Sequence, residues 1–209
     1  ADAFRLPVRN LWPVPDSVPD EVAVFVEPVA AACEITARMA VRPTDRVVVI
    51  GAGKLGLLAA QVLRLTGADL SVVVRHARPA DLLARWGIRA VRREDLPDGQ
   101  ADLVVDCTGT AEGFASALAL VRPRGTLALK STYAGLPQVD LSRIVVNEIH
   151  AVGSRCGPFD AALSLLTQGL VEVTPLIEAR YGLNDARAAL EHAAQPGTLK
   201  VLLDARQSA

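Results

Sequence analysis

Residues 47–56 read VVVIGAGKLG, an apolar run that leads into three glycines with the spacing G-x-G-x-x-G. In this pattern Gly51 permits a tight turn, and Gly53 lets the backbone approach a pyrophosphate without a Cβ in the way. Gly56 lets the following helix pack close to the strand. The free N–H groups and the positive dipole end of that helix then face the diphosphate. The residues predicted to bind a dinucleotide at this turn are Gly51, Gly53, Lys54, Leu55 and Gly56, with a solvated residue at the helix start as the alternative for Lys54.

The sequence on both sides of this turn alternates between strand and helix patterns. Short continuous apolar runs, typical of parallel strands buried on both faces, are separated by helical stretches that stop at glycines. This alternation indicates a parallel, doubly wound α/β sheet of the Rossmann type, and it favours nucleotide binding over a purely structural glycine turn. The expected strands cover residues 47–50, 70–74, 90–91, 103–106, 126–129, 149–153 and 200–203. The expected helices cover residues 28–41, 54–66, 79–86, 111–121, 159–168 and 183–194.

Composition and charge exclude several classes of protein. The chain has 209 residues, 51% of them hydrophobic, and its net charge of -1 is too small for a disordered chain. Lys+Arg of 22 against Asp+Glu of 23 leaves no basic excess for binding nucleic acid. No apolar run reaches the roughly 18 residues of a membrane span, and the N-terminus lacks a secretory pattern. Three widely separated cysteines, Cys33, Cys107 and Cys156, indicate free thiols in a reducing compartment, so we expect a cytoplasmic protein.

The residue after the second expected strand selects the nucleotide. An acidic residue at this position would hold the 2′-hydroxyl of an adenosine ribose, as in NAD binding. Here the residue is Arg75, with His76 and Arg78 close by. An arginine fork pairs with a 2′-phosphate, which a carboxylate would repel. We therefore predict NADP ahead of NAD, with His76 and Arg78 as additional candidate ligands. The alternative is that Arg75 stacks on adenine or is simply exposed.

Two further strand ends should border the same cleft, because ligands of doubly wound sheets bind at the carboxyl ends of the strands. Thr108 and Gly109 follow the fourth expected strand and should line the adenosine part of the cleft. The carboxylate of Asp106, just before them, is equally typical of a group that bonds to nearby backbone. Ser131 and Thr132 follow the fifth expected strand, where the nicotinamide end would meet the chain.

Several of these motifs together resemble the medium-chain, zinc-type alcohol dehydrogenase family, in its sorbitol- and threonine-dehydrogenase-like branch. They are residues 27–32 (EPVAAA), 47–56, 106–109 (DCTG), 130–135 (KSTYAG), 146–148 and 152–159. The resemblance covers nearly the whole chain. It implies an oxidoreductase that transfers hydride between a nicotinamide dinucleotide and a small alcohol or carbonyl substrate, with zinc as the Lewis acid.

The resemblance also implies that the cofactor domain is inserted into a GroES-like catalytic domain, remnants of which lie at both ends of this chain. The part that carries the zinc cysteine and histidine ligands in the family is missing here. Only Glu27 matches a group that approaches the catalytic zinc, and three protein ligands are usual. Lys200 matches a basic residue that contacts the cofactor diphosphate, although an exposed strand-end lysine is an equal alternative. We expect a chain that binds cofactor but is catalytically incomplete.

The expected organisation has three parts. Residues 1–35 hold the remnant of the catalytic domain and the first helix, residues 36–158 the dinucleotide-binding domain, and residues 159–209 the returning helices and strand. The resemblance also predicts a homo-oligomer that associates through the edge strand near residues 149–153. Two alternatives stay open from the sequence. One is a non-catalytic nucleotide-sensing or interaction module, and the weaker one is a methyltransferase on the same sheet.

Overall fold

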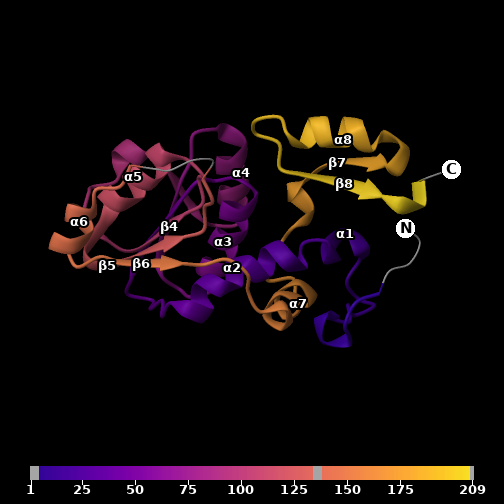
Figure 1. Ribbon diagram of the computed structural model, residues 1–209, viewed down its shortest axis with the longest axis horizontal. Coiled ribbons are helices and arrows are strands. Elements are labelled where there is room, and N and C mark those ends of the chain that lie inside the picture. Colours follow the sequence, from indigo (N-terminus) through magenta and orange to yellow (C-terminus); the bar gives the residue numbers. More distant parts are fainter. Residues whose placement is uncertain (1–4, 134–137, 208–209) are drawn as a thin grey trace.

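A six-stranded parallel sheet forms the larger part of the computed structural model, which describes residues 5–133 and 138–207 (Figure 1). The strand order is β3-β2-β1-β4-β5-β6, and all neighbouring pairs are parallel. This is the Rossmann order, with its switch point between β1 and β4, so the fold class expected from the sequence is confirmed. The strands are β1 (Arg46–Ile50), β2 (Asp69–Val73), β3 (Arg89–Val91), β4 (Ala101–Asp106), β5 (Val121–Leu129) and β6 (His150–Gly153).

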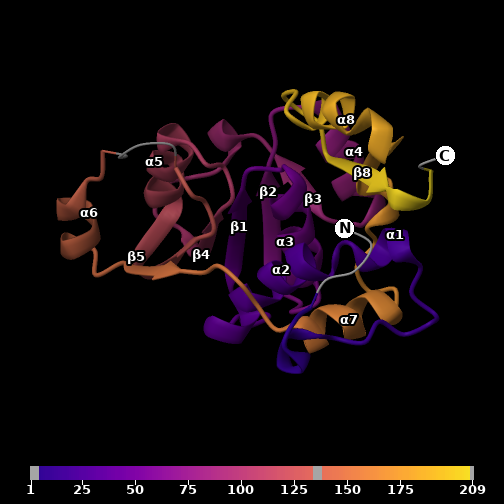
Figure 2. The ribbon, with the colours of Figure 1, turned by 45° about the vertical axis from the view of Figure 1, so that its right-hand side comes forward.

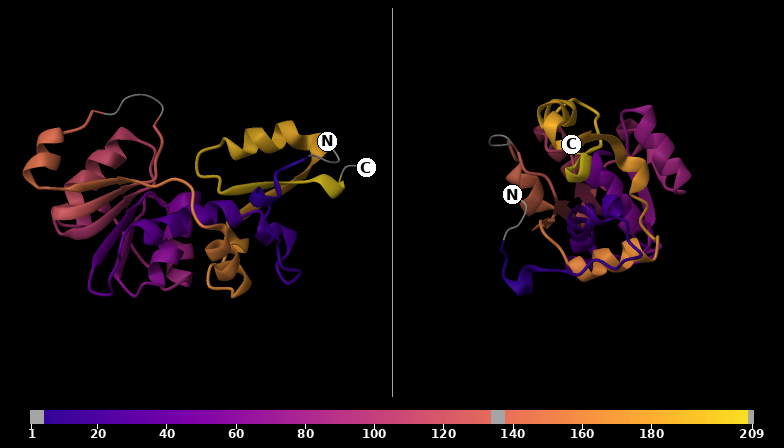
Figure 3. Two further views of the ribbon diagram at one scale, coloured as in Figure 1. Left: turned by 60° about the horizontal axis from the view of Figure 1, so that its bottom comes forward. Right: turned by 90° about the vertical axis from the view of Figure 1, so that its right-hand side faces the viewer.

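Helices pack on both faces of this sheet, and a second, smaller sheet lies to one side of it (Figures 2 and 3). The smaller sheet consists of two parallel strands, β7 (Ile177–Gly182) and β8 (Lys200–Asp204), with a helix between them. The helices are α1 (Asp20–Ala23), α2 (Val26–Arg38), α3 (Lys54–Arg64), α4 (Ala77–Arg85), α5 (Ala111–Leu120), α6 (Leu141–Val146), α7 (Phe159–Thr167) and α8 (Ala186–Ala193).

Apolar side chains fill the space on each side of the large sheet. On one side Val49 of β1 packs in a cluster with Leu57 of α3 and Ile35 of α2, and all three are fully buried. On the other side Val104 of β4 shares a cluster with Phe114 of α5. Successive strand residues point to opposite faces, so a strand covered on both sides needs the continuous apolar run seen in the sequence. Each fully buried Leu or Ile stabilises the fold by about 2 kcal/mol.

The element boundaries differ from the expected ones where proline or weak burial obscures the pattern. Helix α2 begins at Val26, so Pro28 lies in its first turn, where a missing N–H costs no helical hydrogen bond. Strand β5 begins at Val121 rather than at residue 126, and it pairs Val121 with Ala101 before a register shift. The short helices α1 and α6 and strand β7 were not expected. Strand β7 is only half-buried, and its polar residues hide the strand signal.

The predicted three-part division stays a prediction, and its first boundary, after residue 35, falls inside α2. The predicted association through the edge strand is likewise untested. Strand β6 exposes His150, Ala151 and Gly153, and Val145 and Val146 of the neighbouring α6 are more than 70% exposed.

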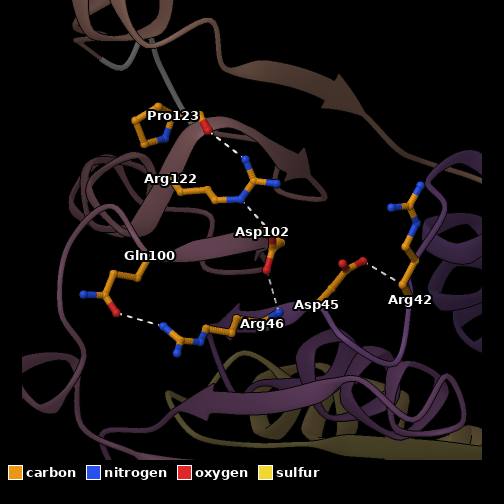
Figure 4. Close-up of polar contacts among 7 residues, drawn as sticks. All are labelled: Arg42, Asp45, Arg46, Gln100, Asp102, Arg122 and Pro123. Carbon is orange, nitrogen blue, oxygen red and sulfur yellow. Dashed lines mark hydrogen bonds and ion pairs between the residues drawn. The ribbon is translucent and has the colours of Figure 1, made fainter.

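A network of polar contacts holds the amino ends of the strands together (Figure 4). The Asp102 carboxylate accepts a hydrogen bond from the backbone N–H of Arg46 at 2.8 Å and from Nε of Arg122 at 2.6 Å. Arg46 also donates to the side chain of Gln100 at 2.9 Å. Asp102 thus joins β1, β4 and β5 at one point. Although burial by itself favours the neutral acid, the Arg46 N–H and Arg122 hold the pKa of Asp102 below its usual value.

Replacing Asp102 with asparagine is expected to lower the free energy of unfolding by about 1 kcal/mol at pH 7, because a charge-assisted contact becomes neutral while Arg122 stays half-exposed. Because the pKa of Asp102 is lower in the folded than in the unfolded chain, its carboxylate stabilises the folded state fully at pH values above the unfolded pKa of about 4. This stabilisation is lost as the pH falls through the pKa of the folded state. Urea unfolding at pH 7 and below pH 4 should therefore show a difference that shrinks in acid.

The control for this substitution is Asp98→Asn, which removes a more exposed carboxylate from an ion pair with Arg93. We expect this variant to stay within about 0.5 kcal/mol of the native chain. If Asp102→Asn were as stable as the native chain at pH 7, the carboxylate would have no such role.

Candidate dinucleotide-binding site

A cleft of about 690 Å³ opens at the carboxyl ends of β1, β2 and β4. Its floor is the turn between β1 and α3, and its walls come from the segments that follow β2, β3 and β4 and from the loop before β8. This is the switch point of the sheet, where ligands of doubly wound proteins bind. A smaller hollow of about 320 Å³ lies toward the amino ends of the strands and is lined by residues such as Arg46, Ser71 and Arg89.

Each of the three glycines in the turn is explained by a different feature of the local geometry. Gly51 has a positive φ of +96°, and a Cβ there would lie 2.8 Å from the backbone of Cys107. A Cβ on Gly56 would lie only 1.7 Å from the carbonyl oxygen of Gly51, so the helix is pressed against the turn. Around Gly53, in contrast, a Cβ would meet no described atom within 4 Å. The open space at Gly53 is where a ligand can approach the backbone.

The start of α3 leaves its N–H groups available to that ligand. The helix begins at Lys54, and its N-cap is Gly53, which has no side chain to cap them. Unpaired N–H groups and the helix dipole make such an end attractive to phosphate. Lys54 is exposed and lines the cleft, whereas Leu55 is half-buried and Gly56 is buried, and neither lines the cleft.

The end of the cleft that the sequence predicts to hold the adenosine is rich in arginine. Arg75 and His76 are exposed and line the cleft directly after β2, as do Arg92 and Arg93 after β3. Arg93 forms an ion pair with Asp98. Among the described residues, Arg75 has no ion-pair partner within 4 Å, so its guanidinium is available to an anion.

Arg78, the third cationic candidate of the sequence, is placed differently. It lies in the first turn of α4, and its Nη1 pairs with Oε2 of Glu178 on β7 at 3.1 Å. Its neighbours Arg75, His76 and Pro79 line the cleft, but Arg78 does not.

Asp106, at the end of β4, organises the loops of the opposite wall. Its fully buried carboxylate accepts hydrogen bonds from the backbone N–H of Thr108 at 2.9 Å and from the Thr108 hydroxyl at 2.7 Å. The hydroxyl of Ser131 lies 3.3 Å away, and Tyr133 also donates to the carboxylate. The role of a carboxylate bonding nearby backbone, left open by the sequence, is thus confirmed. Ser131 in turn accepts from the N–H of Gly109 at 2.8 Å.

The remaining predicted binding residues lie at the border of the cleft. Thr108 lines it, while Gly109, Ser131 and Thr132 follow β4 and β5 just outside. Ala134 and Gly135, which complete the 130–135 motif, lie outside the described residues. The ammonium of Lys200 lies 5.5 Å from the ring centroid of Phe25, and the residues just before Lys200, Thr198 and Leu199, line the cleft.

Lys130 joins the cleft region to α2. Its ammonium donates to the carbonyl oxygen of Ala31 at 2.6 Å, to Ser154 Oγ at 3.0 Å and to the carbonyl oxygen of Arg155 at 3.1 Å. Burial lowers the pKa of Lys130. Three acceptors saturate the three N–H donors of an ammonium group, so this lysine acts as a structural brace. Nearby, burial and Asp106 raise the pKa of the Cys107 thiol to about 12, so it is protonated at neutral pH.

The described residues do not fit a zinc site. Glu27 is exposed on α2, as a metal-facing residue would be, but it stands alone. Within residues 5–133 and 138–207 no three His, Cys, Asp or Glu side chains gather closely enough to hold a metal ion. A catalytic zinc takes three protein ligands.

The sequence reasoning missed part of the cleft lining. Arg92, Arg93 and Glu94 follow a strand that the sequence predicted, so the rule of strand ends would have found them. Gly113 and Ser116 on α5 had no such signal. A Cβ on Gly113 would lie 1.9 Å from the Thr108 hydroxyl, so its importance is visible only in the folded chain.

The strand order, the glycine turn and the cleft at the switch point define a Rossmann domain of the dinucleotide-binding class. The family model of the zinc-binding dehydrogenases matches residues 55–168, more than half of the chain. The chain belongs to this family, as the resemblance in its motifs predicted. The sensing module and the methyltransferase are therefore not favoured.

Curated relatives agree with this assignment. The sorbitol dehydrogenase of Halalkalibacterium halodurans is 30% identical over 213 residues, covering 93% of this chain and 62% of the relative. D-arabinitol dehydrogenase 1 of Uromyces fabae is 28% identical over 218 residues, covering 93% of this chain and 59% of the relative. The chain thus spans about three fifths of the length of these relatives.

Solved structures show the same fold. One from Sinorhizobium meliloti 1021, bound to NADP, has a TM-score of 0.85 at 23% identity. A short chain alcohol dehydrogenase from E. coli CFT073, in complex with NADH, has a TM-score of 0.83 at 22% identity. Each comparison covers 95% of this chain and 63% of the other. Across the part of the chain that the structure describes, the helices are too short or too polar to cross a bilayer.

Proposed function

We propose that this chain is the NADP-binding part of an alcohol or polyol dehydrogenase. In such an enzyme hydride passes between the nicotinamide ring and an alcohol or carbonyl compound. The observation that carries the proposal is the glycine turn at the floor of the cleft, with the unpaired guanidinium of Arg75 at the adenosine end. The relatives support it, since they are named as sorbitol and D-arabinitol dehydrogenases.

In this proposal the residues of the chain bind and orient the coenzyme. The N–H groups at the start of α3 hold the diphosphate near Gly53, and Arg75 pairs with the 2′-phosphate. Thr108 borders the adenosine part of the cleft, and the segment around Ser131 and Thr132 supports its wall. The bound coenzyme supplies the hydride chemistry. No step is assigned to zinc, because the described residues do not hold it.

The choice between the two nicotinamide coenzymes depends on Arg75. The Arg75→Asp variant should raise the Kd for NADPH by about 10- to 100-fold, because it replaces a charge-assisted contact with repulsion. The Kd for NADH should change by less than about threefold, since its ribose carries a neutral hydroxyl. Isothermal titration calorimetry with both reduced coenzymes measures both values.

Arg38→Asp provides the matched control, because it makes the same change of charge at an exposed residue of α2 that does not line the cleft. Unchanged NADPH binding in Arg75→Asp would refute the NADP assignment. If the native chain bound neither coenzyme at millimolar concentration, the whole proposal would fail.

A further inference from the structure

Glu178 of β7 connects the smaller sheet with the adenosine end of the cleft. Its Oε2 atom pairs with Nη1 of Arg78 on α4 at 3.1 Å and accepts the backbone N–H of Leu199 at 2.8 Å. The Glu178 side chain is 22% exposed and that of Arg78 is 50% exposed. Because Leu199 itself lines the cleft, this single carboxylate touches both a cleft wall and a cationic side chain beside the cleft.

Arg78 lies in a segment with several residues that line the cleft, where it could bind a phosphate, but its guanidinium pairs with a carboxylate instead. The residues on either side of it, Arg75 and His76 before and Pro79 after, all line the cleft. Arg78 does not, because its guanidinium reaches toward Glu178. A half-exposed arginine at the start of a helix has enough freedom to change partners.

We propose that Glu178 limits the preference for NADP over NAD by competing with the 2′-phosphate of NADP for Arg78. This inference rests on the proposed function. One guanidinium fork that is paired with a carboxylate is not free for a phosphate. NAD carries a neutral hydroxyl at the same position and is not affected. Glu178 therefore weakens the binding of NADP relative to NAD.

Other contacts keep Glu178 in place when Arg78 leaves it. The N–H of Leu199 still donates to Oε2, and Nε2 of His192 on α8 lies 3.8 Å from Oε1. Nδ1 of His192 is held in turn by the Tyr181 hydroxyl at 3.0 Å. The Leu199 N–H and Arg78 also hold the pKa of Glu178 below its usual value, so the carboxylate is charged at neutral pH. Exchange of Arg78 between two anions thus leaves the cleft wall intact.

The Glu178→Gln variant separates charge from structure, because the amide oxygen can still accept the N–H of Leu199. Calorimetric titration of the chain with NADPH should show a Kd about three- to tenfold lower than in the native chain, as expected for release of one half-exposed ion pair. The Kd for NADH should stay within about twofold. If the ratio of the Kd for NADPH to the Kd for NADH were the same in Glu178→Gln and in the native chain, the proposal would be overturned.

Two further variants test whether the effect passes through Arg78. Arg78→Gln alone should raise the Kd for NADPH by about threefold without changing the Kd for NADH. This single variant tests the role of Arg78 even if the Glu178→Gln protein does not fold. In the double variant the gain from Glu178→Gln should disappear. Glu172→Gln is the control, since Glu172 pairs with Arg85 and Trp86 and does not line the cleft.

The outcomes distinguish this proposal from the proposed function. If both coenzymes bind but Glu178→Gln leaves their ratio unchanged, only the role of Glu178 is refuted. The same holds if the gain in NADPH affinity persists without Arg78, or if Glu172→Gln reproduces it. If neither coenzyme binds the native chain, the proposed function is refuted first, and the selectivity proposal is refuted with it.

Discussion

Replacing Gly56 with alanine is expected to destabilise the domain by about 3 kcal/mol and to weaken coenzyme binding more than tenfold. The added Cβ would lie 1.7 Å from the carbonyl oxygen and 2.9 Å from the carbonyl carbon of Gly51, and both of these are backbone atoms of the tight turn. Overpacking of this kind forces the backbone to shift, which costs one to a few kcal/mol. Urea unfolding measures the stability, and a coenzyme fluorescence titration measures the binding.

Gly53→Ala is the matched control for this substitution. Its Cβ would meet no described atom within 4 Å, and its φ of -85° suits any L-residue. We expect its stability to stay within about 0.5 kcal/mol of the native chain, while binding weakens because the methyl group occupies the approach of the diphosphate. If Gly56→Ala were as stable as Gly53→Ala, close packing of helix and turn would not explain the third glycine.

The contrast between these two glycines shows why the turn could be predicted from the sequence. A strand, a tight turn and a helix start impose their requirements on neighbouring residues, so the spacing alone carries the information. The positions of the strands in the large sheet followed from the same local logic, because parallel strands buried on both faces need continuous apolar runs. The family resemblance then added the function, which spacing alone does not specify.

Contacts between distant segments could not be predicted in this way. Arg78 lies beside Arg75 in the sequence and was expected to bind the same phosphate, but it pairs with Glu178, a hundred residues away. The partner of a flexible charged side chain depends on tertiary packing, for which the sequence has no local signal. Strand β7, which brings Glu178 to this position, was also not expected, because its half-buried, partly polar residues hide the strand signal.

Removal of the Asp106 carboxylate is expected to have the other large effect. Asp106→Ala should lower the free energy of unfolding by about 3 kcal/mol, because donors on Thr108, Ser131 and Tyr133 lose a fully buried acceptor. Asp106→Asn should cost about half as much, since its one remaining oxygen can serve only part of the network. Urea unfolding at pH 7 provides both values. A loss of less than 1 kcal/mol in Asp106→Ala would contradict this role.

The hydroxyl of Tyr133 allows a spectroscopic test of the same network. Burial and Asp106 raise the pKa of Tyr133 well above its usual range. The chain has two tyrosines, so in a Tyr181→Phe background the tyrosinate absorbance reports Tyr133 alone. We expect its midpoint to lie above the usual value of about 10 and to fall in Asp106→Asn, where the charge is removed. Because the pKa of Tyr133 is higher in the folded than in the unfolded chain, the stability contributed by its protonated hydroxyl is complete below about pH 10. This stability is lost as the pH rises through the pKa of the folded state. The native chain should therefore lose more stability in alkali than Asp106→Asn does, and equal midpoints in the two proteins would show that the carboxylate does not act on this hydroxyl.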